Sequence, residues 1–347
     1  MKPRTTIRDV ARKAGVSVGT VSRVVNGHPS VTDAKKRAVL AVIAELGFQP
    51  DAAAQSLRRG TNRTIGVVIP DLRNPFFAEL MQHIELRAKE RGYSVLFASS
   101  DDQTDSEAEL ITNLARRKVE GVVVVPSNRA ETLANPDGVR LVVVDRRIAG
   151  LPFVGADHRA GARMATEYLV SLGHRCIACI SGPENSFVAR ERLAGFMDVM
   201  AGRFAEAGLD PATCIASAPF EYEGGREAAN ALLADDGPRP TAIFACSDQQ
   251  AIGVLRAGFD RRLAIPADLS VVGFDGILIS DLVAPRLTTA AQPVSLMANC
   301  ATDLLIDGEP LDPSASHVFP CAMAVRETCA PPRQGRSVQP QTRNMLE

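Results

Sequence analysis

The stretch that most constrains this chain is Ile7–Gly27, close to its N-terminus. Two apolar stripes at helical spacing run through it and are separated by Gly15-Val16-Ser17, a pattern that predicts two short helices joined by a turn, the helix-turn-helix layout. The second helix begins with small residues and carries Arg23 on its exposed side, which suits a helix N-terminus in a DNA major groove with the guanidinium at a guanine edge. The alternative is a helical hairpin that only packs.

The distribution of charge agrees with a DNA-binding N-terminal region. Residues 1–63 contain twelve Lys and Arg against four Asp and Glu, a net charge of +8, whereas the remainder carries −9. A basic region joined to an acidic body suggests that only the basic region meets phosphate.

Residues 28–63 predict one further helix and a short segment that cannot fold alone. Thr32 is a suitable N-cap for a helix through Leu46, which Gly47 then ends. Residues 52–59 hold three alanines and one leucine, too little apolar surface for an independent helix, so a flexible basic linker is one reading of this segment.

From Thr64 the pattern changes to alternating strands and helices, which predicts parallel sheets with right-handed crossovers. The expected helices include Phe77–Arg91 and Ser106–Arg117. The expected strands form two sets: Ile65–Ile69, Val95–Ala98, Val122–Val125 and Leu141–Val144, then Cys176–Ile180, Cys214–Ser217, Ala242–Ala245 and Leu269–Val272.

Polar residues follow several of these strands. In open parallel sheets, ligands bind beyond the carboxyl ends of the strands. Carboxylates, Arg and Asn beside aromatic faces suit a polyhydroxylated ring, which offers hydroxyl pairs and an apolar face. The residues selected on this basis are Asn74, Phe76, Phe77, Asp145, Arg146, Arg192 and Asp275.

Other classes of protein are disfavoured. No apolar run reaches the roughly 18 residues of a membrane span, and no signal sequence is visible, so a cytoplasmic protein is expected. Dinucleotide, P-loop, nucleophile-elbow and metal-ligand spacings are missing, so we expect no enzyme, no metal and no cofactor. Cys176 and Cys179 form a C-x-x-C, but residues three apart on a strand face opposite ways, so reduced core thiols are expected rather than a redox or zinc site.

The N-terminal residues resemble the DNA-binding domain of the LacI family of bacterial repressors. The matching segments are Thr6–Ala11, Gly15–Ser17, Thr20–Asn26 and Ala53–Leu57. The resemblance implies that Val18, Gly19 and Arg23 read bases; because Gly19 has no side chain and Val18 offers only apolar contact, Arg23 would carry most of the direct readout. It further implies a hinge helix in 51–63 in which Leu57 wedges between base steps and Arg58 and Arg59 hold phosphate. The remaining DNA-contacting positions would be Thr6, Thr20, Ser22, Asn26 and Ala54.

The resemblance extends to about residue 330 and implies the overall architecture. The fold class is α/β, an all-α helix-turn-helix domain (1–50) followed by a periplasmic-binding-protein-like core (64–330) of two subdomains. The chain is expected to cross between them near residues 158, 292 and 317, giving an N-subdomain of 64–158 and 293–317 and a C-subdomain of 159–292 and 318–330. Residues 331–347, rich in Pro, Gln and Arg, are expected to be disordered; they lack leucine heptads, so a homodimer is expected rather than a tetramer.

Several core segments also resemble the binding segments of periplasmic ribose-binding proteins. By that likeness, Asn74, Asp145, Arg146, Arg192, Asp275 and Gln292 would hydrogen-bond a sugar that Phe76, Phe77 and Phe220 sandwich. Ser247 departs from the pattern, which has Asn there, and this leaves the identity of the sugar open.

The expected function is therefore a dimeric repressor on a pseudo-palindromic operator, with DNA affinity controlled by ribose or a similar sugar. The alternative is a purine-responsive regulator of the same family, in which Phe76 and Phe220 would stack a flat ring. The sign of the response and the operator sequence are not specified by these residues.

Overall fold

The structure is a computed structural model that describes residues 5–25, 28, 30–48, 62–128, 130–135, 138–234, 239–307 and 311–333. The chain divides into two compact units, Met1–Arg63 and Thr64–Glu347. The expected hinge helix, with Ala54, Leu57, Arg58 and Arg59, lies outside the described residues, as do Asn26 and the part of the expected tail from residue 334.

The first unit contains the helices α1 (Ile7–Lys13), α2 (Val18–Val25) and α3 (Asp33–Leu46). The prediction of two helices around a turn is confirmed, and the turn places Gly15 at a φ of +64°. Thr32 and Gly47 flank α3 as expected, with Gly47 in the left-handed conformation common at helix C-termini. A small core holds the three helices together, formed by Val10, Ala11, Val21, Val24 and Val39.

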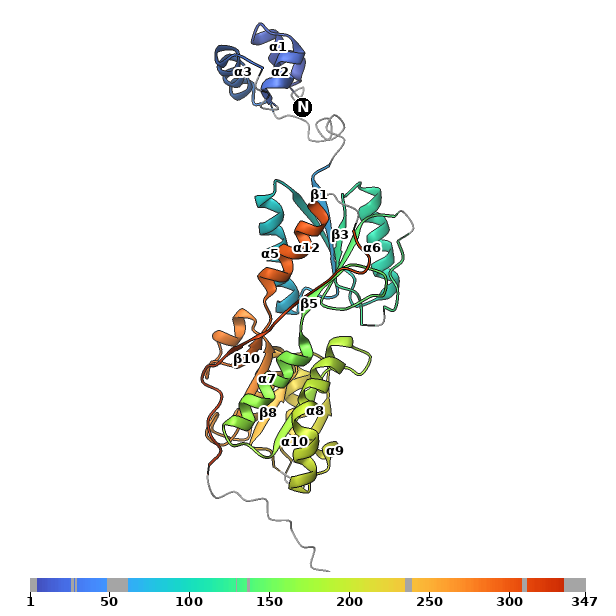
Figure 1. The fold of residues 1–347 in the computed structure, drawn as a ribbon. Helices are drawn as coiled ribbons and strands as arrows, with labels where there is room; N and C mark the ends of the chain where they lie inside the picture. The colour runs from blue at the N-terminus through green and yellow to red at the C-terminus, as the bar shows by residue number, and fades with distance from the viewer. Residues whose placement is uncertain are drawn as a thin grey trace, which may run out of the picture. The chain divides into compact units, whose positions relative to one another are not determined.

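The second unit consists of two α/β lobes (Figure 1). The sheet of the first lobe is entirely parallel, in the order β11-β5-β4-β3-β1-β2. Its strands are β1 (Thr64–Ile69), β2 (Ser94–Ser99), β3 (Val122–Val124), β4 (Leu141–Val144), β5 (Phe153–Ala156) and β11 (Ser316–Phe319). Its helices are α5 (Pro75–Glu90), α6 (Thr104–Arg116) and α12 (Val294–Ile306).

The sheet of the second lobe has the order β12-β10-β9-β8-β6-β7 and is parallel except for β12, which runs antiparallel to β10. Its strands are β6 (Ile177–Ser181), β7 (Ile215–Ser217), β8 (Ala242–Ala245), β9 (Ser270–Asp275), β10 (Thr288–Ala291) and β12 (Ala322–Ala324). Its helices are α7 (His158–Ser171), α8 (Phe187–Ala207), α9 (Pro211–Cys214), α10 (Tyr222–Leu232), α11 (Asp248–Asp260) and the 3-10 helix η1 (Leu278–Asp281).

Both sheets are buried on their two faces, which explains why their central strands are continuous apolar runs. On β1, Ile65, Val67 and Ile69 pack toward α5 and α12, whereas Val68 packs toward α6. On β6, Ile177 and Cys179 pack toward α7 and α8, whereas Ala178 and Ile180 pack toward α10 and α11. Each lobe therefore has helices on both sides of one sheet.

The chain passes between the lobes at three places. The first two are Asp157, between β5 and α7, and residues 292–293, between β10 and α12. The third lies at residues 320–321, after the expected position 317. The sequence predicts that Val318 and Phe319 belong to the C-subdomain, but both pair with β5 in the sheet of the first lobe. The predicted boundary at residue 317 is therefore wrong.

Two further expectations can be compared with the fold. All seven cysteines are free; Cys179 Sγ lies 3.9 Å from Cys246 Sγ in the core, whereas Cys176 interacts with Cys214, so the two thiols of the C-x-x-C face different partners. The tail was expected to begin at residue 331, but Arg333 donates a 2.8 Å hydrogen bond to Asp268 and belongs to the second lobe. Among the described residues, no helix is long and apolar enough to cross a bilayer.

Candidate functional site

The second helix of the first unit presents a polar face to solvent. Val21 and Val24 are buried in the small core, which leaves Arg23 and Gly19 exposed and Val18 half-buried. Ser17 Oγ accepts from the backbone N–H of Thr20 at 3.1 Å and fixes the start of α2. The helix is therefore anchored through one side while its start and Arg23 remain accessible.

Thr6 was expected to contact DNA and lies at the start of α1. Its hydroxyl donates to Asp9 Oδ2 at 2.6 Å, and its backbone N–H donates to the same oxygen at 3.0 Å. The first of these hydrogen bonds also holds the pKa of Asp9 below its ordinary value. Thr6 caps α1 and is also exposed, so it remains accessible from solvent.

In the second unit, two aspartates stand at strand ends in a backbone conformation that favours glycine. Asp145 follows β4 with a φ of +68°, and Asp275 ends β9 with a φ of +121°. Non-glycine residues adopt such conformations infrequently, and strained examples cluster at functional sites. Both side chains are almost fully buried at the interface between the lobes.

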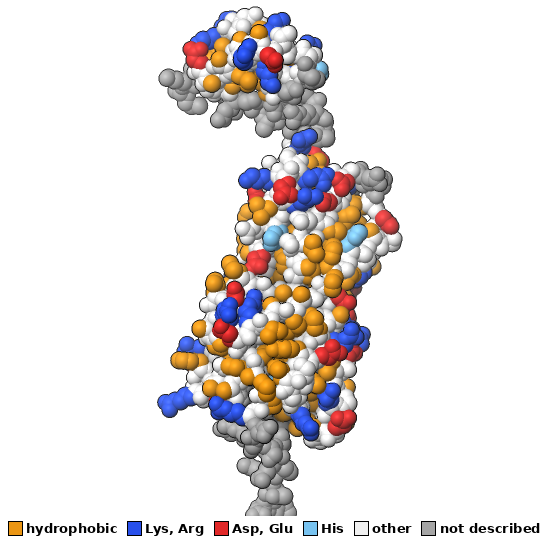
Figure 2. All heavy atoms as spheres, turned by 60° about the vertical axis from the view of Figure 1, so that its left-hand side comes forward, with side chains coloured by type: hydrophobic (Ala, Val, Ile, Leu, Met, Phe, Trp, Pro, Cys, Tyr) orange, Lys and Arg blue, Asp and Glu red, His pale blue; other side chains and the backbone are white. Residues whose placement is uncertain are grey.

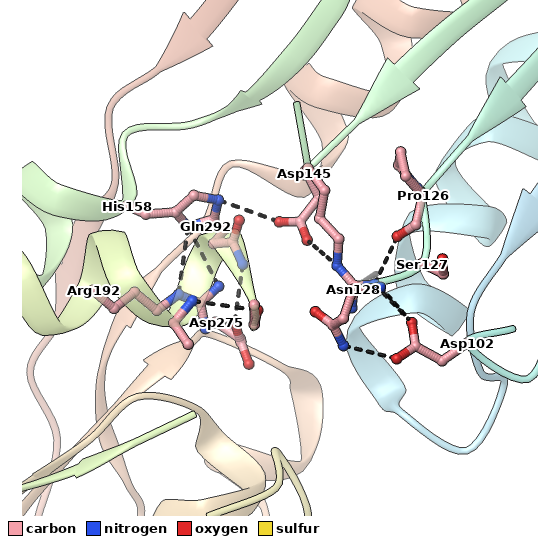
Figure 3. A network of polar contacts seen from close by, with 12 residues as sticks. Asp102, Pro126, Ser127, Asn128, Asp145, His158, Arg192, Asp275 and Gln292 are labelled. Carbon is pink, nitrogen blue, oxygen red and sulfur yellow. Dashed lines mark hydrogen bonds and ion pairs between the residues drawn. The ribbon is translucent and has the colours of Figure 1, made fainter. Parts of the chain in front are cut away.

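Arg192 lies at the centre of the polar network in the second lobe (Figure 3). Its Nη1 is 3.1 Å from Asp275 Oδ1 and donates to the carbonyl of Cys246 at 2.6 Å. Gln292 Nε2 donates to the same Asp275 oxygen at 2.9 Å. The guanidinium also lies over two aromatic rings, 4.0 Å from the centroid of Phe274 and 5.6 Å from that of Phe220.

Arg146 has the equivalent position in the first lobe. Its Nη1 donates to Asp102 Oδ1 at 3.0 Å and to the carbonyl of Pro126 at 2.6 Å. The Asp102 carboxylate also accepts from the backbone and side-chain nitrogens of Asn128, each at 2.9 Å. Arg146 is held in this way with its Nε directed toward Asp145 Oδ2, 4.0 Å away, and its guanidinium over the Phe77 ring.

The two halves of the network meet at Asp145 and His158, where His158 Nε2 lies 3.4 Å from Asp145 Oδ1 (Figure 3). Burial acts to raise the pKa of Asp145, but His158, Arg192 and Arg146 outweigh it and hold the pKa below its ordinary value. The pKa of Asp275 is raised because burial and Asp145 outweigh Arg192 and Gln292. The surroundings therefore favour the charge of Asp145 and disfavour that of Asp275.

Several buried polar atoms of this interface have no hydrogen-bond partner in the described part of the chain. The acceptors are Asp145 Oδ1, Gln292 Oε1 and Asn128 Oδ1, and the nitrogens are Arg146 Nε and His158 Nε2. Buried polar groups are nearly always paired, and each exception requires an explanation. Donors and acceptors of both lobes, beside aromatic rings, are suited to an uncharged polar molecule held between the lobes.

The predicted residues thus divide into a polar network, one core residue and two helix caps. Asp145, Arg146, Arg192, Phe220, Asp275 and Gln292 contact one another or their shared partners, and Phe77 joins through Arg146. Phe76 packs edge-on against Phe77 in the core of the first lobe. Asn74 and Ser247 instead cap helices: Asn74 accepts from Phe76 N at 3.1 Å, and Ser247 accepts from Gln250 N at 3.2 Å.

The structure adds residues that sequence reasoning missed. His158, Asp102, Asn128 and Phe274 all contact the predicted set. Asp248, next to Ser247, accepts from the backbone of Gly276 and Ile277 and from the Thr289 hydroxyl and so fixes the loop after β9. A weak sequence signal for Asp102 is its place in the loop after a strand, three residues beyond β2, whereas Asp145 directly follows β4.

Comparison with known proteins decides the family. Residues 6–51 match the family described as bacterial regulatory proteins, lacI family, and residues 166–329 match the periplasmic binding protein-like domain. The ribose operon repressor of Halalkalibacterium halodurans is 37% identical over 328 residues, which cover 93% of this chain and 97% of that protein. The chain belongs to the LacI family.

Other LacI-family members are nearly as similar. Catabolite control protein A of Priestia megaterium is 36% identical, covering 86% of this chain and 91% of that protein, and the transcriptional repressor PurR of Haemophilus influenzae is 33% identical, covering 87% and 90%. Among solved structures, the lac repressor dimer bound to operator and the anti-inducer ONPF has a TM-score of 0.81 at 28% identity, over 94% of this chain and all of that one. A regulator from Enterococcus faecium with bound ribose has a TM-score of 0.65 at 27% identity, over 77% and 99%.

As a LacI-family protein, the chain is a DNA-binding transcriptional regulator, and both the helix-turn-helix unit and the two-lobed core agree with that assignment. The prediction of the family and of the fold class is confirmed.

Proposed function

We propose that this LacI-family protein is a transcriptional repressor whose affinity for its operator is controlled by an uncharged sugar, ribose or a close relative, bound between the two lobes. The observation that carries the proposal is the set of buried donors and acceptors from both lobes that lack a partner among the described residues. The names of two relatives add support, since one is a ribose operon repressor and one neighbouring structure contains ribose.

Charge favours an uncharged ligand. Arg146 is paired with Asp102, and Arg192 with Asp275, so neither guanidinium is left to balance a phosphate or carboxylate. Asp145, with its lowered pKa, adds a full negative charge that would repel an anion. A sugar hydroxyl, by contrast, can donate to Asp145 and accept from Arg146.

A purine-responsive regulator is the second candidate, supported by the similarity to PurR and by the aromatic rings. The rings do not favour it, because Phe220 faces the Arg192 guanidinium and Phe77 faces that of Arg146. One face of each ring is therefore already covered by a cation, which leaves a flat base only the opposite face on which to stack.

Burial of the site suggests how binding is coupled to motion. Asp145, His158, Arg192 and Asp275 are each at most 6% exposed, so a ligand reaches them only when the lobes separate. A ligand that then bridges the lobes stabilises the closed arrangement. The ligand can change the free energy of DNA binding by no more than the difference between its binding free energies for the open and the closed lobes.

We infer that the protein acts as a homodimer through an apolar surface that extends over both lobes. Exposed apolar side chains lie beside α5 and in η1, and the backbone N–H of Leu278 in η1 donates to Glu79 of α5 at 2.7 Å, so these two elements are adjacent. Figure 2 shows hydrophobic side chains gathered on one face of the second unit. The exposed apolar residues in or next to these two elements are Leu72, Leu86, Leu278, Ile279 and Leu282, and Phe97 is exposed on the edge strand β2.

Because this surface includes both lobes, lobe closure would shift one half of the surface relative to the other. In the proposed mechanism this shift moves the two N-terminal units of the dimer and separates or aligns their hinge segments on the operator. The DNA contacts expected from the sequence (Val18, Gly19, Arg23 and the hinge residues) remain proposals, as do an effector-only role without catalysis and a cytoplasmic location.

The experiment that tests the proposal is fluorescence anisotropy with the DNA upstream of the gene, without effector and then with ribose, other pentoses, hexoses and purine bases. A change in DNA affinity with one sugar is the expected result. Binding that responds only to a purine would overturn the sugar proposal and support the second candidate.

A further inference from the structure

His158 is a buried histidine at the lobe interface that the sequence reasoning did not select. It is the first residue of α7, directly after the lobe crossing at Asp157, whose carboxylate caps the helix by accepting from Ala160 N at 2.9 Å. The side chain is 3% exposed and packs against the Phe274 ring, with centroids 6.0 Å apart. Its backbone is thus fixed by a helix start and its ring by an aromatic neighbour.

Arg192 determines which nitrogen of His158 carries the proton. Arg192 Nε and Nη2 each lie 3.4 Å from His158 Nδ1. A guanidinium can only donate hydrogen bonds, so Nδ1 is the acceptor and the proton of the neutral ring lies on Nε2. The Nε2–H donor is therefore oriented by Arg192 toward the first lobe.

Nε2 faces Asp145 Oδ1 across the boundary between the lobes at 3.4 Å (Figure 3). Both atoms are buried, and apart from this long contact with each other neither has a hydrogen-bond partner in the described part of the chain. A donor from one lobe and an acceptor from the other thus stand side by side, each with unused capacity.

One chemical group satisfies both atoms together. A hydroxyl oxygen can accept from His158 Nε2–H while its own hydrogen is donated to Asp145 Oδ1. A carbonyl or ether oxygen only accepts, and an N–H group only donates, so either would leave one buried atom unpaired, at a cost that a hydroxyl avoids.

We propose that His158 and Asp145 together read one hydroxyl group of the effector, and that His158 is in this way a specificity-determining residue. The proposal rests on the proposed function, since it requires a hydroxylated ligand between the lobes. It adds that ligand recognition depends on a contact shared by both lobes, so the same hydroxyl that selects the ligand also holds the lobes together.

The test is isothermal titration of the full-length protein with D-ribose and its monodeoxy analogues, each missing one hydroxyl, for wild type, His158→Leu and His158→Gln. Removing the donor should weaken D-ribose binding about 10- to 100-fold, the range for a buried hydrogen bond with a charged neighbour. For the one analogue that lacks the hydroxyl contacted by His158, the affinity of His158→Leu should be less than about 3-fold below that of wild type, because that analogue makes no hydrogen bond to His158 in either protein. His158→Gln, whose side-chain amide donates from nearly the same place, should recover much of the affinity.

A structural role for His158 predicts something else: every analogue weakened by the same factor and no recovery with Gln. That result would overturn the proposal, as would unchanged ribose affinity in His158→Leu. Failure of wild type to bind any polyol would overturn both this proposal and the proposed function, whereas sugar binding that is indifferent to His158 overturns this one alone.

A measurement on the unmodified protein guards against misfolded variants. The chain has five histidines, so side-chain ¹⁵N spectra can resolve His158, with His158→Gln giving the assignment. The free protein should show the Nε2–H tautomer, and saturating D-ribose should shift that resonance. An Nδ1–H tautomer, or a resonance that ribose leaves unmoved, would contradict the proposal.

Discussion

Arg192 and Asp275 form an ion pair with 3.1 Å between Nη1 and Oδ1, and both side chains are almost completely buried. The surroundings of the two partners differ in how well they stabilise the charge. The pKa of Asp275 is raised by burial, and Asp145 disfavours its charge further, whereas Arg192 also has the Cys246 carbonyl and two aromatic faces as partners.

The pair should therefore respond asymmetrically to substitution. Arg192→Ala removes the cation and leaves buried negative charge unpaired, which should cost about 3–5 kcal/mol of unfolding free energy at pH 7. Asp275→Asn also removes one partner of the pair, but its charge is already disfavoured by burial and by Asp145, and Arg192 keeps Asp145 nearby, so the loss should be clearly smaller than that of Arg192→Ala. Urea unfolding of the two variants measures this difference; equal losses would contradict the unequal roles of the partners.

Asp248 makes stability depend on pH. Burial and the nearby Asp275 raise its pKa to about 8. The folded protein then binds this proton more tightly than the unfolded chain. Protonation of Asp248 therefore stabilises the folded state fully below pH 3.8, and this stabilisation is lost as the pH rises through about 8. Asp248→Asn should flatten the decline in unfolding free energy between pH 5 and 8 by up to about 1.4 kcal/mol per pH unit, the value for one proton.

A suitable control for Asp248→Asn is Asp312→Asn. Hydrogen bonds from Ser314 lower the pKa of Asp312 below its ordinary value of 3.8. Its effect on stability is therefore constant at neutral pH and is lost only as the pH falls into the acid range. The slope of stability between pH 5 and 8 should be that of wild type in this variant. If both variants, or neither, changed the slope, the assignment to Asp248 would be wrong.

Two glycines of α8 provide a matched pair for the packing of the second lobe. A Cβ at Gly195 would lie 2.2 Å from the Arg159 carbonyl on α7, whereas a Cβ at Gly202 meets nothing within 4 Å. Gly195→Ala should destabilise the protein by at least about 2 kcal/mol through the forced separation of the helices. Gly202→Ala should stabilise it by about 0.5–1 kcal/mol, since alanine favours the helix. Thermal unfolding of both variants tests the close approach of α7 to α8.

Arg23 is exposed on α2, and we expect it to provide most of the direct base readout. Arg23→Ala should weaken binding to the operator by about 1–3 kcal/mol, the value of one bidentate contact with guanine. Binding to an unrelated DNA of equal length should fall far less, because phosphate contacts elsewhere remain. Anisotropy titrations at a single salt concentration compare the two; equal losses would assign Arg23 to phosphate.

Leu57 is expected from the family resemblance to act as a wedge in the minor groove. Leu57→Ala should lower operator affinity about tenfold or more, because the bent DNA would lose the side chain that holds a base step apart. Sugar affinity of the free protein should be unchanged. Intact operator binding in this variant would show that the wedge role is wrong.

The central strands of both sheets could be predicted because they are buried on two faces and are therefore continuous apolar runs. The strands next to the lobe crossings could not. β10 reads Thr-Thr-Ala-Ala and β11 reads Ser-His-Val-Phe, and neither has a periodicity that distinguishes it from a loop. Their pairing with β9 and β5 is decided by contacts far apart in sequence, which is also why the third crossing was placed too early.

The candidate site shows the same limit. Strand-end aspartates can be located by pattern, but Asn and Ser before a helix are equally good N-caps, and the structure gives that role to Asn74 and Ser247. His158 carries no pattern of its own. Its importance comes from Asp145 and Arg192, which different strands and helices bring to it.

The three crossings between the lobes have a consequence for synthesis. The first lobe takes its last strand, β11, from Ser316–Phe319, long after β5 at Phe153–Ala156. A chain that leaves the ribosome from its N-terminus must therefore produce nearly the whole second lobe before the first sheet can be completed. Nascent chains arrested near residue 300 should therefore lack β11 and leave the edge of β5 unpaired.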